Sequence, residues 1–443
     1  MAAESPIKPR AASVPQGRAR RFLHLGRAVG EMAAGAAAEG LSQLARGQRP
    51  ALADLMLTPD NARRLAERLS TMRGAVMKVG QLMSMDGHGV LPEHFSALLG
   101  GLRDRAHAMP ATQLVEVLAG EYGADWHRRF RRFSFEPIAS ASIGQVHRAE
   151  THDGQVLALK IQYPGVRESI DSDVDNLALL ARTPGLVPAE VDIRAILARV
   201  REQLHHETDY LAEARAVTEY RLRLGDDPVL TVPAVHPEHC TAQIIATDFA
   251  PGVPVDRLAQ PGTPQAQRDH VAGALSRLSV HEFFRMRLVQ TDPNFGNYLF
   301  DAATGRVALL DFGATEAVSD TRVEQLRAIG RCLRDGDTAG LASAARAAGF
   351  TDAEDTPAQT EGVLALMRMA GEPLQQAGLY DFGASTLMAR TYSQGRDQFF
   401  AEGYGRAPPA DLLFLQRKFV GTFMLCTRLR ARLDIQAVFA GEL

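Results

Sequence analysis

The sequence predicts a two-lobed α+β protein with a helical extension on its N-terminal side. The chain has 443 residues, and single hydrophobic cores stop growing at roughly 250–300 residues, so at least two lobes are expected. Short strand patterns cluster between residues 130 and 250, whereas helical periodicity dominates before and after them. Separate runs of strands and of helices are typical of α+β architecture.

The composition is that of a folded protein with a nearly neutral charge. Apolar residues make up 46% and charged residues 23% of the chain, which excludes a wholly disordered or fibrous protein. The net charge is −3, so no nucleic-acid partner is expected. The three cysteines, Cys240, Cys332 and Cys426, match neither a disulfide framework nor a metal-ligand spacing, which favours a reducing compartment.

Residues 1–50 are interpreted as a basic tail and linker. In the first 30 residues several basic side chains accompany a single acid, Glu4, and three prolines oppose helix formation. A solvated disordered tail, a contact with a membrane surface and a mitochondrial transit peptide are left open. No stretch approaches the roughly 18 apolar residues of a membrane-spanning helix, the C-terminal Ala437–Leu443 included, so a peripheral membrane contact is expected.

A helical extension is predicted over residues 51–129. Thr58, Pro59 and Asp60 are typical of a helix start, with an N-cap, a proline at the first helical position and an acid in the first turn. Apolar residues then recur at spacings of three and four, as on one face of an amphipathic helix: Leu65, Leu69, Met72, Val76, Val79 and Met83. A second helix is predicted over residues 112–122.

The smaller lobe is predicted over residues 130–250 and the larger, mostly helical lobe over residues 251–443. Along one predicted strand, Lys160 shares a face with the small residues Val156 and Ala158. Strands are expected at residues 133–138, 144–150, 155–162 and 241–249 and on both sides of a turn within 298–310, and helices at 170–181, 188–224 and 321–333. The adjacent His205 and His206 are expected on a helix surface, because neighbouring helical side chains point about 100° apart.

The strongest chemical signal is a pair of motifs in the larger lobe. The spacing from Asp292 to Asn297 matches the Asp-x-x-x-x-Asn of the protein-kinase catalytic loop, and Asp311-Phe312-Gly313 follows after an apolar run. Phosphoryl transfer needs oxygen ligands for Mg²⁺ and a carboxylate that orients the attacking group. Asp292 is therefore predicted as the base or orienting residue, and Asn297 and Asp311 as metal ligands. A second Asp-Phe-Gly, at residues 381–383, has no catalytic loop before it and is interpreted as structural.

A second set of motifs lies in the smaller lobe. The segment ending in Lys160 has the form of the kinase strand V-A-I-K, whose lysine contacts the nucleotide phosphates; a solvated edge lysine is the alternative. One hairpin earlier, a loop occupies the place of the kinase glycine-rich loop but retains only Gly144. Its Cβ atoms remove the left-handed conformations that glycine allows, so a stiffer phosphate-binding loop is expected. The loop consists of Ala139, Ser140, Ala141 and Ser142.

Together these motifs resemble the UbiB/AarF-type atypical kinase-like family, which is linked to ubiquinone (coenzyme Q) biosynthesis. The resemblance covers nearly the whole chain from the first amphipathic helix onward. Its most diagnostic element is Lys78-Val79-Gly80-Gln81, which matches the family's K-x-G-Q motif. Further matches are Ile143–His147 after the Ala/Ser loop, Lys160–Val166, the E-x-D motif at Glu207-Thr208-Asp209, and residues 290–297 and 311–315. The one departure is Ser140, where the family often has alanine.

The resemblance implies roles that spacing alone does not assign. Glu213 is implied as the helix glutamate that pairs with Lys160. Asp248, Phe249 and Ala250 are implied as a hinge whose backbone groups contact adenine.

The K-x-G-Q motif is implied to reach the nucleotide site. Lys78 and Gln81 would point into this site, with Glu207 as the partner of Lys78. Judged by spacing alone, a surface Lys/Gln pair is the alternative, since residues three apart share one helix face.

The resemblance implies an enzyme that depends on ATP (or ADP) and Mg²⁺ and supports ubiquinone biosynthesis, as an ATPase or a phosphotransferase toward a small molecule or lipid. The chain runs from Asp311-Phe312-Gly313 directly into the predicted helix 321–333 and has no Ala-Pro-Glu, which argues against a general protein kinase. A protein kinase and a nucleotide-binding scaffold of a coenzyme Q biosynthetic complex are the alternatives.

The partners implied are a nucleotide, coenzyme Q biosynthetic proteins, and a peripheral contact with a membrane or a quinone-precursor lipid. A homodimer is left open. The expected location is the cytoplasm, at the periphery of the inner membrane, or the mitochondrial matrix if the source is eukaryotic.

Overall fold

The computed structural model describes residues 109–181, 193–292, 294–398 and 410–443. The chain divides into two compact units: unit 1 comprises Met1–Arg215 and Val235–Phe249, and unit 2 comprises Ala216–Ala234 and Ala250–Leu443. The predicted tail and the predicted helix with Lys78 and Gln81 lie outside the described residues.

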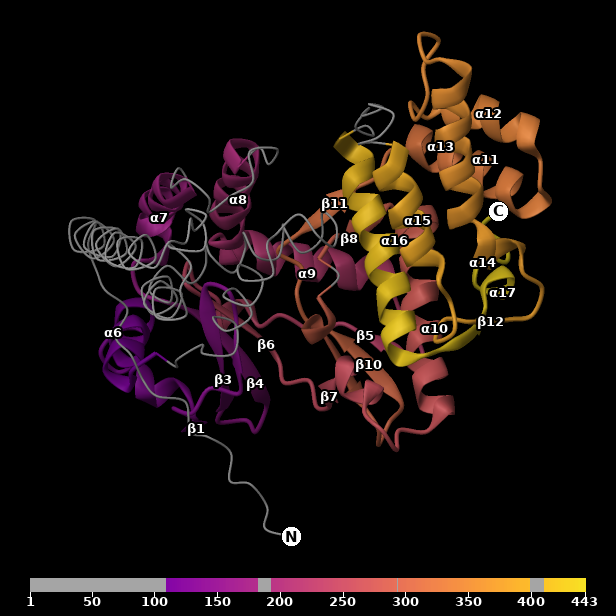
Figure 1. The fold of residues 1–443 in the computed structure, drawn as a ribbon. Helices are drawn as coiled ribbons and strands as arrows, with labels where there is room; N and C mark the ends of the chain where they lie inside the picture. Colours follow the sequence, from indigo (N-terminus) through magenta and orange to yellow (C-terminus); the bar gives the residue numbers. More distant parts are fainter. Residues whose placement is uncertain (1–108, 182–192, 293, 399–409) are drawn as a thin grey trace, which may run out of the picture. The chain divides into compact units, whose positions relative to one another are not determined.

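Unit 1 is built on an antiparallel sheet in the order β1-β3-β4-β6, and β2 also pairs with β3 (Figure 1). The bounds of the strands are Arg132–Phe133 (β1), Ala139–Ser140 (β2), Gly144–Glu150 (β3), Val156–Gln162 (β4) and Ile244–Asp248 (β6). The alternation predicted for β4 is observed, because Leu157, Leu159 and Ile161 are fully buried while Lys160 is only partly covered. Lys160 pairs with Val146 on one side and Ile245 on the other.

The apolar face of this sheet is covered by α6 (Ala111–Tyr122), which confirms the predicted helix 112–122. Leu114 and Leu118 of α6 belong to the same buried cluster as Leu157 and Leu159 of β4. Fully burying a leucine side chain stabilises a fold by roughly 1.5–3 kcal/mol, so this apolar contact fixes α6 on the sheet.

The predicted strand 133–138 is wrong. Strand β1 ends at Phe133, and the chain turns with a hydrogen bond from Ser134 Oγ to the Glu136 carbonyl (3.0 Å) before β2 begins. Pro137 lacks the N–H that a continuous ladder needs, so the segment pairs with β3 as two short strands.

The predicted helix 188–224 is two helices. Unit 1 contains α7 (Val166–Ala181) and α8 (Ile193–Glu207), and α9 (Tyr210–Leu224) runs from unit 1 into unit 2. The break falls at Thr208 and Asp209. Thr208 Oγ1 donates to the carbonyl of His205 in the last turn of α8 (2.8 Å), and Asp209 Oδ1 accepts from the Ala212 N–H in the first turn of α9 (2.9 Å). Such side-chain caps end one helix and start the next.

Unit 2 contains three small sheets. The largest has the strand order β5-β10-β9-β7, in which β9 and β10 form the predicted antiparallel hairpin and β5 runs parallel to β10. Two-stranded sheets pair β8 with β11 and β12 with β13. The bounds are Leu230–Thr231 (β5), Val253–Pro254 (β7), Leu288–Gln290 (β8), Tyr298–Asp301 (β9), Arg306–Leu309 (β10), Thr315–Ala317 (β11), Leu379–Asp381 (β12) and Arg432–Asp434 (β13).

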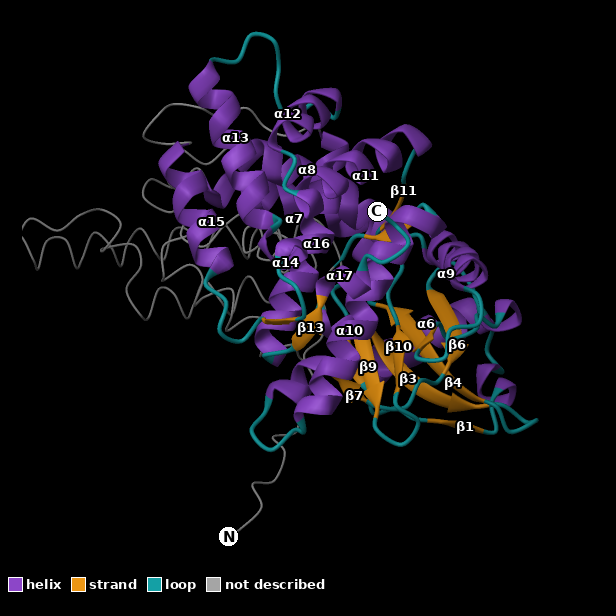
Figure 2. Ribbon diagram, turned by 90° about the vertical axis from the view of Figure 1, so that its right-hand side faces the viewer, coloured by secondary structure: helices purple, strands orange, loops and turns teal. Residues whose placement is uncertain are grey.

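Helices make up most of unit 2, and α10 packs against α16 in its core. The helices are Gln265–His281 (α10), Asp320–Asp335 (α11), Thr338–Ala347 (α12), Pro357–Ala370 (α13), Glu372–Gln375 (α14), Leu387–Arg396 (α15), Ala410–Leu429 (α16) and Ile435–Val438 (α17). Within unit 2, α12 and α13 lie at the end opposite β7 and β9 (Figure 2). Among the described residues, no helix combines the length and the apolarity required to cross a bilayer.

Candidate functional site

Lys160 of β4 is paired with Glu213 of α9. Its Nζ lies 2.7 Å from Oε1 and 2.9 Å from Oε2 of Glu213, and the two side chains are 20% and 5% exposed. The Tyr210 ring also lies beneath the ammonium group, with its centroid 5.1 Å from Nζ. Because β4 is an inner strand of the sheet, Lys160 is not a solvated edge lysine. The ion pair that the resemblance implied is therefore present in unit 1.

The E-x-D motif brings Glu213 to this position. Asp209 caps α9, and the Glu213 N–H donates to the Asp209 carbonyl (3.0 Å), so Asp209 and Glu213 belong to one helical turn. An acid in the first turn also interacts favourably with the helix dipole. The other acid of the motif, Glu207, lies in the last turn of α8 and accepts a hydrogen bond from Ser142 Oγ (3.0 Å).

The Ala/Ser loop is a tight connection between β2 and β3. The Ala141 N–H donates to the Gly144 carbonyl (2.9 Å), which closes the turn, and Ser142 is tied to α8 through Glu207. A Cβ at Gly144 would lie 2.3 Å from the Ile161 carbonyl oxygen. Glycine is therefore required here by the close approach of β3 to β4, a packing reason that the sequence did not reveal.

The residues implied as a hinge follow β6. Asp248 is the last residue of this strand, and its Oδ1 lies 2.8 Å from Nε2 of His236. The Phe249 N–H donates to the Val156 carbonyl of β4 (2.9 Å). Unit 1 ends at Phe249, and Ala250 begins the long segment of unit 2.

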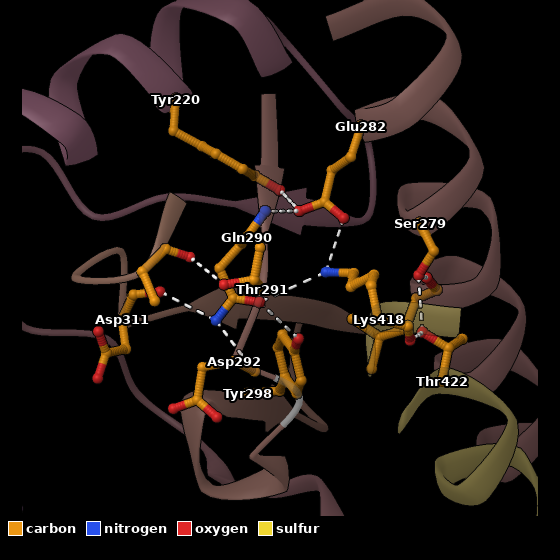
Figure 3. A network of polar contacts seen from close by, with 12 residues as sticks. Tyr220, Ser279, Glu282, Gln290, Thr291, Asp292, Tyr298, Asp311, Lys418 and Thr422 are labelled. Atoms are coloured by element: carbon orange, nitrogen blue, oxygen red, sulfur yellow. Dashed lines mark hydrogen bonds and ion pairs between the residues drawn. The ribbon is translucent and has the colours of Figure 1, made fainter. Parts of the chain in front are cut away.

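Unit 2 brings Asp292 and Asn297 together. Asn297 Nδ2 donates to Asp292 Oδ2 (3.3 Å), and the Leu310 N–H donates to the Asn297 carbonyl (3.0 Å), so the segment that leads to Asp311 runs beside the predicted catalytic loop. Asp311 Oδ1 accepts the Gly313 N–H (2.9 Å). Figure 3 shows Asp292 and Asp311 on the opposite side of Gln290 from Lys418.

The donor atoms of unit 2 suit Mg²⁺. Carboxylate and amide oxygens are the hard ligands that this ion prefers, and Mg²⁺ usually binds one or two carboxylates together with phosphate oxygens and water. Because Asn297 uses its amide nitrogen for Asp292, its amide oxygen points elsewhere. In the part of the chain that the structure describes, no group of three or more His, Cys, Asp or Glu side chains could hold a metal.

The sequence analysis included Gln290 in a motif but assigned it no role, and the structure shows that it contacts both segments. Its side chain is buried, and Nε2 donates to the carbonyl oxygens of Asp292 (2.8 Å) and Asp311 (3.2 Å). On the other side, Oε1 accepts from Tyr298 (3.2 Å) and lies 3.4 Å from Lys418 Nζ (Figure 3). In the sequence, Lys418 lies among the apolar residues Leu415, Phe419 and Val420, which is a sign of a buried charge.

The second Asp-Phe-Gly, at residues 381–383, has a packing role. Asp381 ends β12, Phe382 is buried, and a Cβ at Gly383 would lie 2.8 Å from that of Arg430.

The segment after the first Asp-Phe-Gly differs from the prediction. The chain does not enter a helix directly, because β11 pairs with β8 before α11 begins at Asp320. His205 and His206 are exposed, as predicted.

Comparisons with known proteins identify the family of this chain. The family model described as the ABC1 atypical kinase-like domain matches residues 101–345. The mitochondrial atypical kinase COQ8 of Saccharomyces cerevisiae is 33% identical over 432 residues, which cover 97% of this chain and 85% of that protein. The mitochondrial atypical kinase COQ8B of Rattus norvegicus is 34% identical over 440 residues, which cover 98% and 81%.

A solved structure shows the same fold. A Mycobacterium tuberculosis protein determined in complex with erythromycin superimposes with a TM-score of 0.60 at 26% identity, covering 87% of this chain and 96% of that chain. The α+β kinase-like fold class and the enzyme class predicted from the sequence are thereby confirmed. With a family model that matches more than half of its length and relatives that match nearly all of it, the chain belongs to the ABC1 atypical kinase-like family, as its motifs predicted.

Proposed function

We propose that this chain is an ATP- and Mg²⁺-dependent enzyme that supports ubiquinone biosynthesis, as an ATPase or as a phosphotransferase toward a small molecule or lipid. The observation that carries the proposal is the arrangement of Asp292, Asn297 and Asp311. The side chains of Asp292 and Asn297 are hydrogen-bonded to each other. The backbone carbonyls of Asp292 and Asp311 both accept from the side chain of Gln290. Oxygen ligands of this type are what phosphoryl transfer requires.

In this proposal the side chains of unit 2 handle the metal and the attacking group. Asn297 and Asp311 hold Mg²⁺, which neutralises the charge of the phosphate oxygens. Asp292 accepts the hydrogen bond of the attacking hydroxyl or water and orients it. The contact between Asp292 and Asn297 keeps the orienting carboxylate beside the metal ligand.

The side chains of unit 1 bind the nucleotide. Lys160, oriented by Glu213, contacts the phosphates, and the Ala139–Ser142 loop lies beside them, with its Ala141 N–H used in the turn itself. The backbone of Asp248, Phe249 and Ala250 contacts adenine.

The extension is proposed to restrict the acceptor. Residues 51–129 form the extension, and residues 130–250 and 251–443 form the two lobes. Lys78 and Gln81, with Glu207 as the partner of Lys78, limit what can approach the terminal phosphate. This restriction and the short segment after Gly313 favour a small acceptor over a protein hydroxyl.

The names of its relatives support a proposal for the location and the partners of the enzyme. The yeast and rat relatives are named mitochondrial, so we propose a matrix location in a eukaryotic source and the cytoplasm, at the inner membrane, in a bacterial one. Coenzyme Q biosynthetic proteins and a quinone-precursor lipid at the membrane surface are the proposed partners.

The two Asp-Phe-Gly segments provide a matched test of this function. Asp311 and Asp381 each accept the N–H of the glycine two residues later at 2.9 Å, so substitution by Asn perturbs both turns alike. Asp311→Asn is expected to abolish ATP turnover and stabilisation by Mg-ADP, whereas Asp381→Asn retains both. Thermal unfolding with and without Mg-ADP measures the effect, since a ligand at about 100 times its Kd stabilises a protein by about 2.7 kcal/mol. Equal stabilisation of the two variants would overturn the metal assignment.

A further inference from the structure

We propose that the buried ion pair between Lys418 and Glu282 positions the catalytic acids through Gln290. The inference rests on the proposed function, because it assigns positioning residues to that same site. Lys418 and Glu282 both contact Gln290, whose amide group binds the backbone of the two acids.

The ion pair is completely enclosed in unit 2. Nζ of Lys418, on α16, lies 2.6 Å from Oε2 of Glu282, and the two side chains are 3% and 0% exposed. Burial by itself lowers the pKa of Lys418, but the Glu282 carboxylate and then Tyr298 outweigh it, so the pKa is raised and the lysine is charged. A buried ion pair adds little stability over an apolar pair of similar volume. The ion pair therefore contributes mainly by orienting the side chains around it.

Glu282 is held in a single orientation by its other oxygen. Oε1 accepts from the hydroxyl of Tyr220 (2.5 Å) and from the backbone N–H of Gln290 (3.1 Å) (Figure 3). Glu282 begins a π-helical turn (η5, Glu282–Met286), which ends at Arg287 in the left-handed conformation with φ 53°. Single π turns of this kind are frequent at functional sites. This turn connects α10 to β8, so the carboxylate returns to contact the strand that carries Gln290.

The charge of Lys418 determines which way the Gln290 amide faces. The groups near Oε1, the Lys418 ammonium and the Tyr298 hydroxyl, are donors, and both groups near Nε2 are carbonyl oxygens. An ammonium group has no acceptor lone pair, whereas a hydroxyl can rotate to accept. Lys418 is therefore the group that opposes a flipped amide, in which the Gln290 oxygen would face the carbonyls of Asp292 and Asp311.

The consequence is that one side chain fixes two catalytic segments to each other. The loop after β8 carries Asp292, and the segment after β10 carries Asp311. A second connection runs beside it, because the N–H (2.8 Å) and the hydroxyl (3.0 Å) of Thr291 both donate to the Ala314 carbonyl. Loss of the Gln290 connection leaves this neighbouring one, so the fold survives while the spacing of the acids loosens.

The test uses the full chain with the double substitution Glu282→Gln/Lys418→Met, which removes both charges and leaves no unpaired buried ion. The matched control is Thr422→Val, one turn further along α16. Thr422 Oγ1 lies 2.8 Å from Ser279 Oγ of α10 and donates to the Lys418 carbonyl, but it has no described contact with Gln290 (Figure 3).

The double variant is expected to lose kcat for ATP by roughly 10- to 100-fold, the scale of a 1 Å misplacement of a reacting group. The Mg²⁺ concentration for half-maximal turnover rises, whereas KM for ATP at saturating Mg²⁺ changes less than kcat. Gln290→Glu, which keeps the size but replaces both donors by acceptors, behaves in the same way. If the double variant matches Thr422→Val in kcat and in Mg²⁺ requirement, the pair only stabilises the fold and the proposal is wrong.

Hydrogen exchange without nucleotide separates this inference from the proposed function. Amides of residues 291–297 and 311–315 are expected to exchange faster in the double variant than in Thr422→Val, whether or not the wild type hydrolyses ATP. Faster exchange together with an inactive wild type would refute the function and keep the positioning role. Equal exchange in the two variants would refute the positioning role itself.

Discussion

At the scale of single residues, His147 is a titratable side chain held neutral inside unit 1. It is buried in β3 and stacks on Phe133, with ring centroids 5.5 Å apart. Nδ1 lies 2.8 Å from the Ser134 carbonyl oxygen and therefore carries the proton, and Nε2 lies 2.7 Å from Nε2 of Gln145, from which it accepts. Burial lowers the pKa of His147, and the hydrogen bond to Ser134 only partly offsets this.

This residue is expected to make stability depend on pH. Because the folded pKa lies below the usual value near 6.5, the unfolded chain binds more protons as pH falls, so the contribution of His147 is present above about pH 6.5 and is lost below it. Urea unfolding of wild type and His147→Gln between about pH 7.5 and pH 5.5 measures it. The wild type should lose more stability than the variant, by at most about 1.4 kcal/mol per pH unit. The exposed His206→Gln should behave as wild type, and equal losses in all three would contradict the prediction.

The residues that could be predicted from the sequence have partners close to them along the chain, whereas the residues without a predicted role have distant partners. Asp292, Asn297 and Asp311 lie within one short segment, so their spacing was enough to predict them as a group, and the structure places Asp292 beside Asn297. Gln290 and Lys418 are 128 positions apart. Periodicity shows that a helix has an apolar face, but it does not show which strand that face will meet.

At the scale of elements, the cap between α8 and α9 links helix geometry to Lys160, the lysine proposed to bind the nucleotide phosphates. Asp209→Ala removes the hydrogen bond to the Ala212 N–H and is expected to cost about 0.5–2 kcal/mol of stability. Because Glu213 lies in the same turn, its contact with Lys160 loosens as well. We expect weaker ADP binding in calorimetry.

The conservative change Asp209→Asn is the control for this prediction. Asparagine caps a helix about as well as aspartate, so both stability and ADP binding should be close to wild type. If Asp209→Ala also binds ADP like the wild type, the cap does not influence Lys160.

A hairpin with a glycine at its turn was predicted correctly. Strand and helix boundaries that depend on one residue within a continuous pattern were not. The β9–β10 hairpin was predicted from a glycine in a turn between two apolar runs. The structure shows why glycine marks this turn, because Gly305 adopts φ 72°, a conformation that favours glycine. The apolar residues around Pro137 suggested one continuous strand, yet the missing N–H of this proline divides it. Likewise, the helical pattern continues through Asp209, and only its capping bond reveals that a new helix begins there.

At the scale of the whole molecule, the products of ATP turnover distinguish the proposed activities. Labelled phosphate is expected in inorganic phosphate or in a lipid extract, and not on protein, when the enzyme is incubated with anionic phospholipid vesicles and a quinone-precursor lipid. The reason is the short path from Gly313 through β11 to α11, which leaves little chain for a peptide-binding platform. Label on protein that disappears in Asp292→Asn would show a protein kinase instead.

The order of the units along the chain has a consequence for biosynthesis. Strand β6 completes the sheet of unit 1 but is made only after Ala216–Ala234, which belong to unit 2. Until the ribosome has added Ile244–Asp248, β4 remains an open edge whose backbone groups lack the partners that β6 provides. Such an edge is a template for intermolecular pairing. A nascent chain paused before β6 is therefore expected to be exposed to intermolecular pairing at this edge.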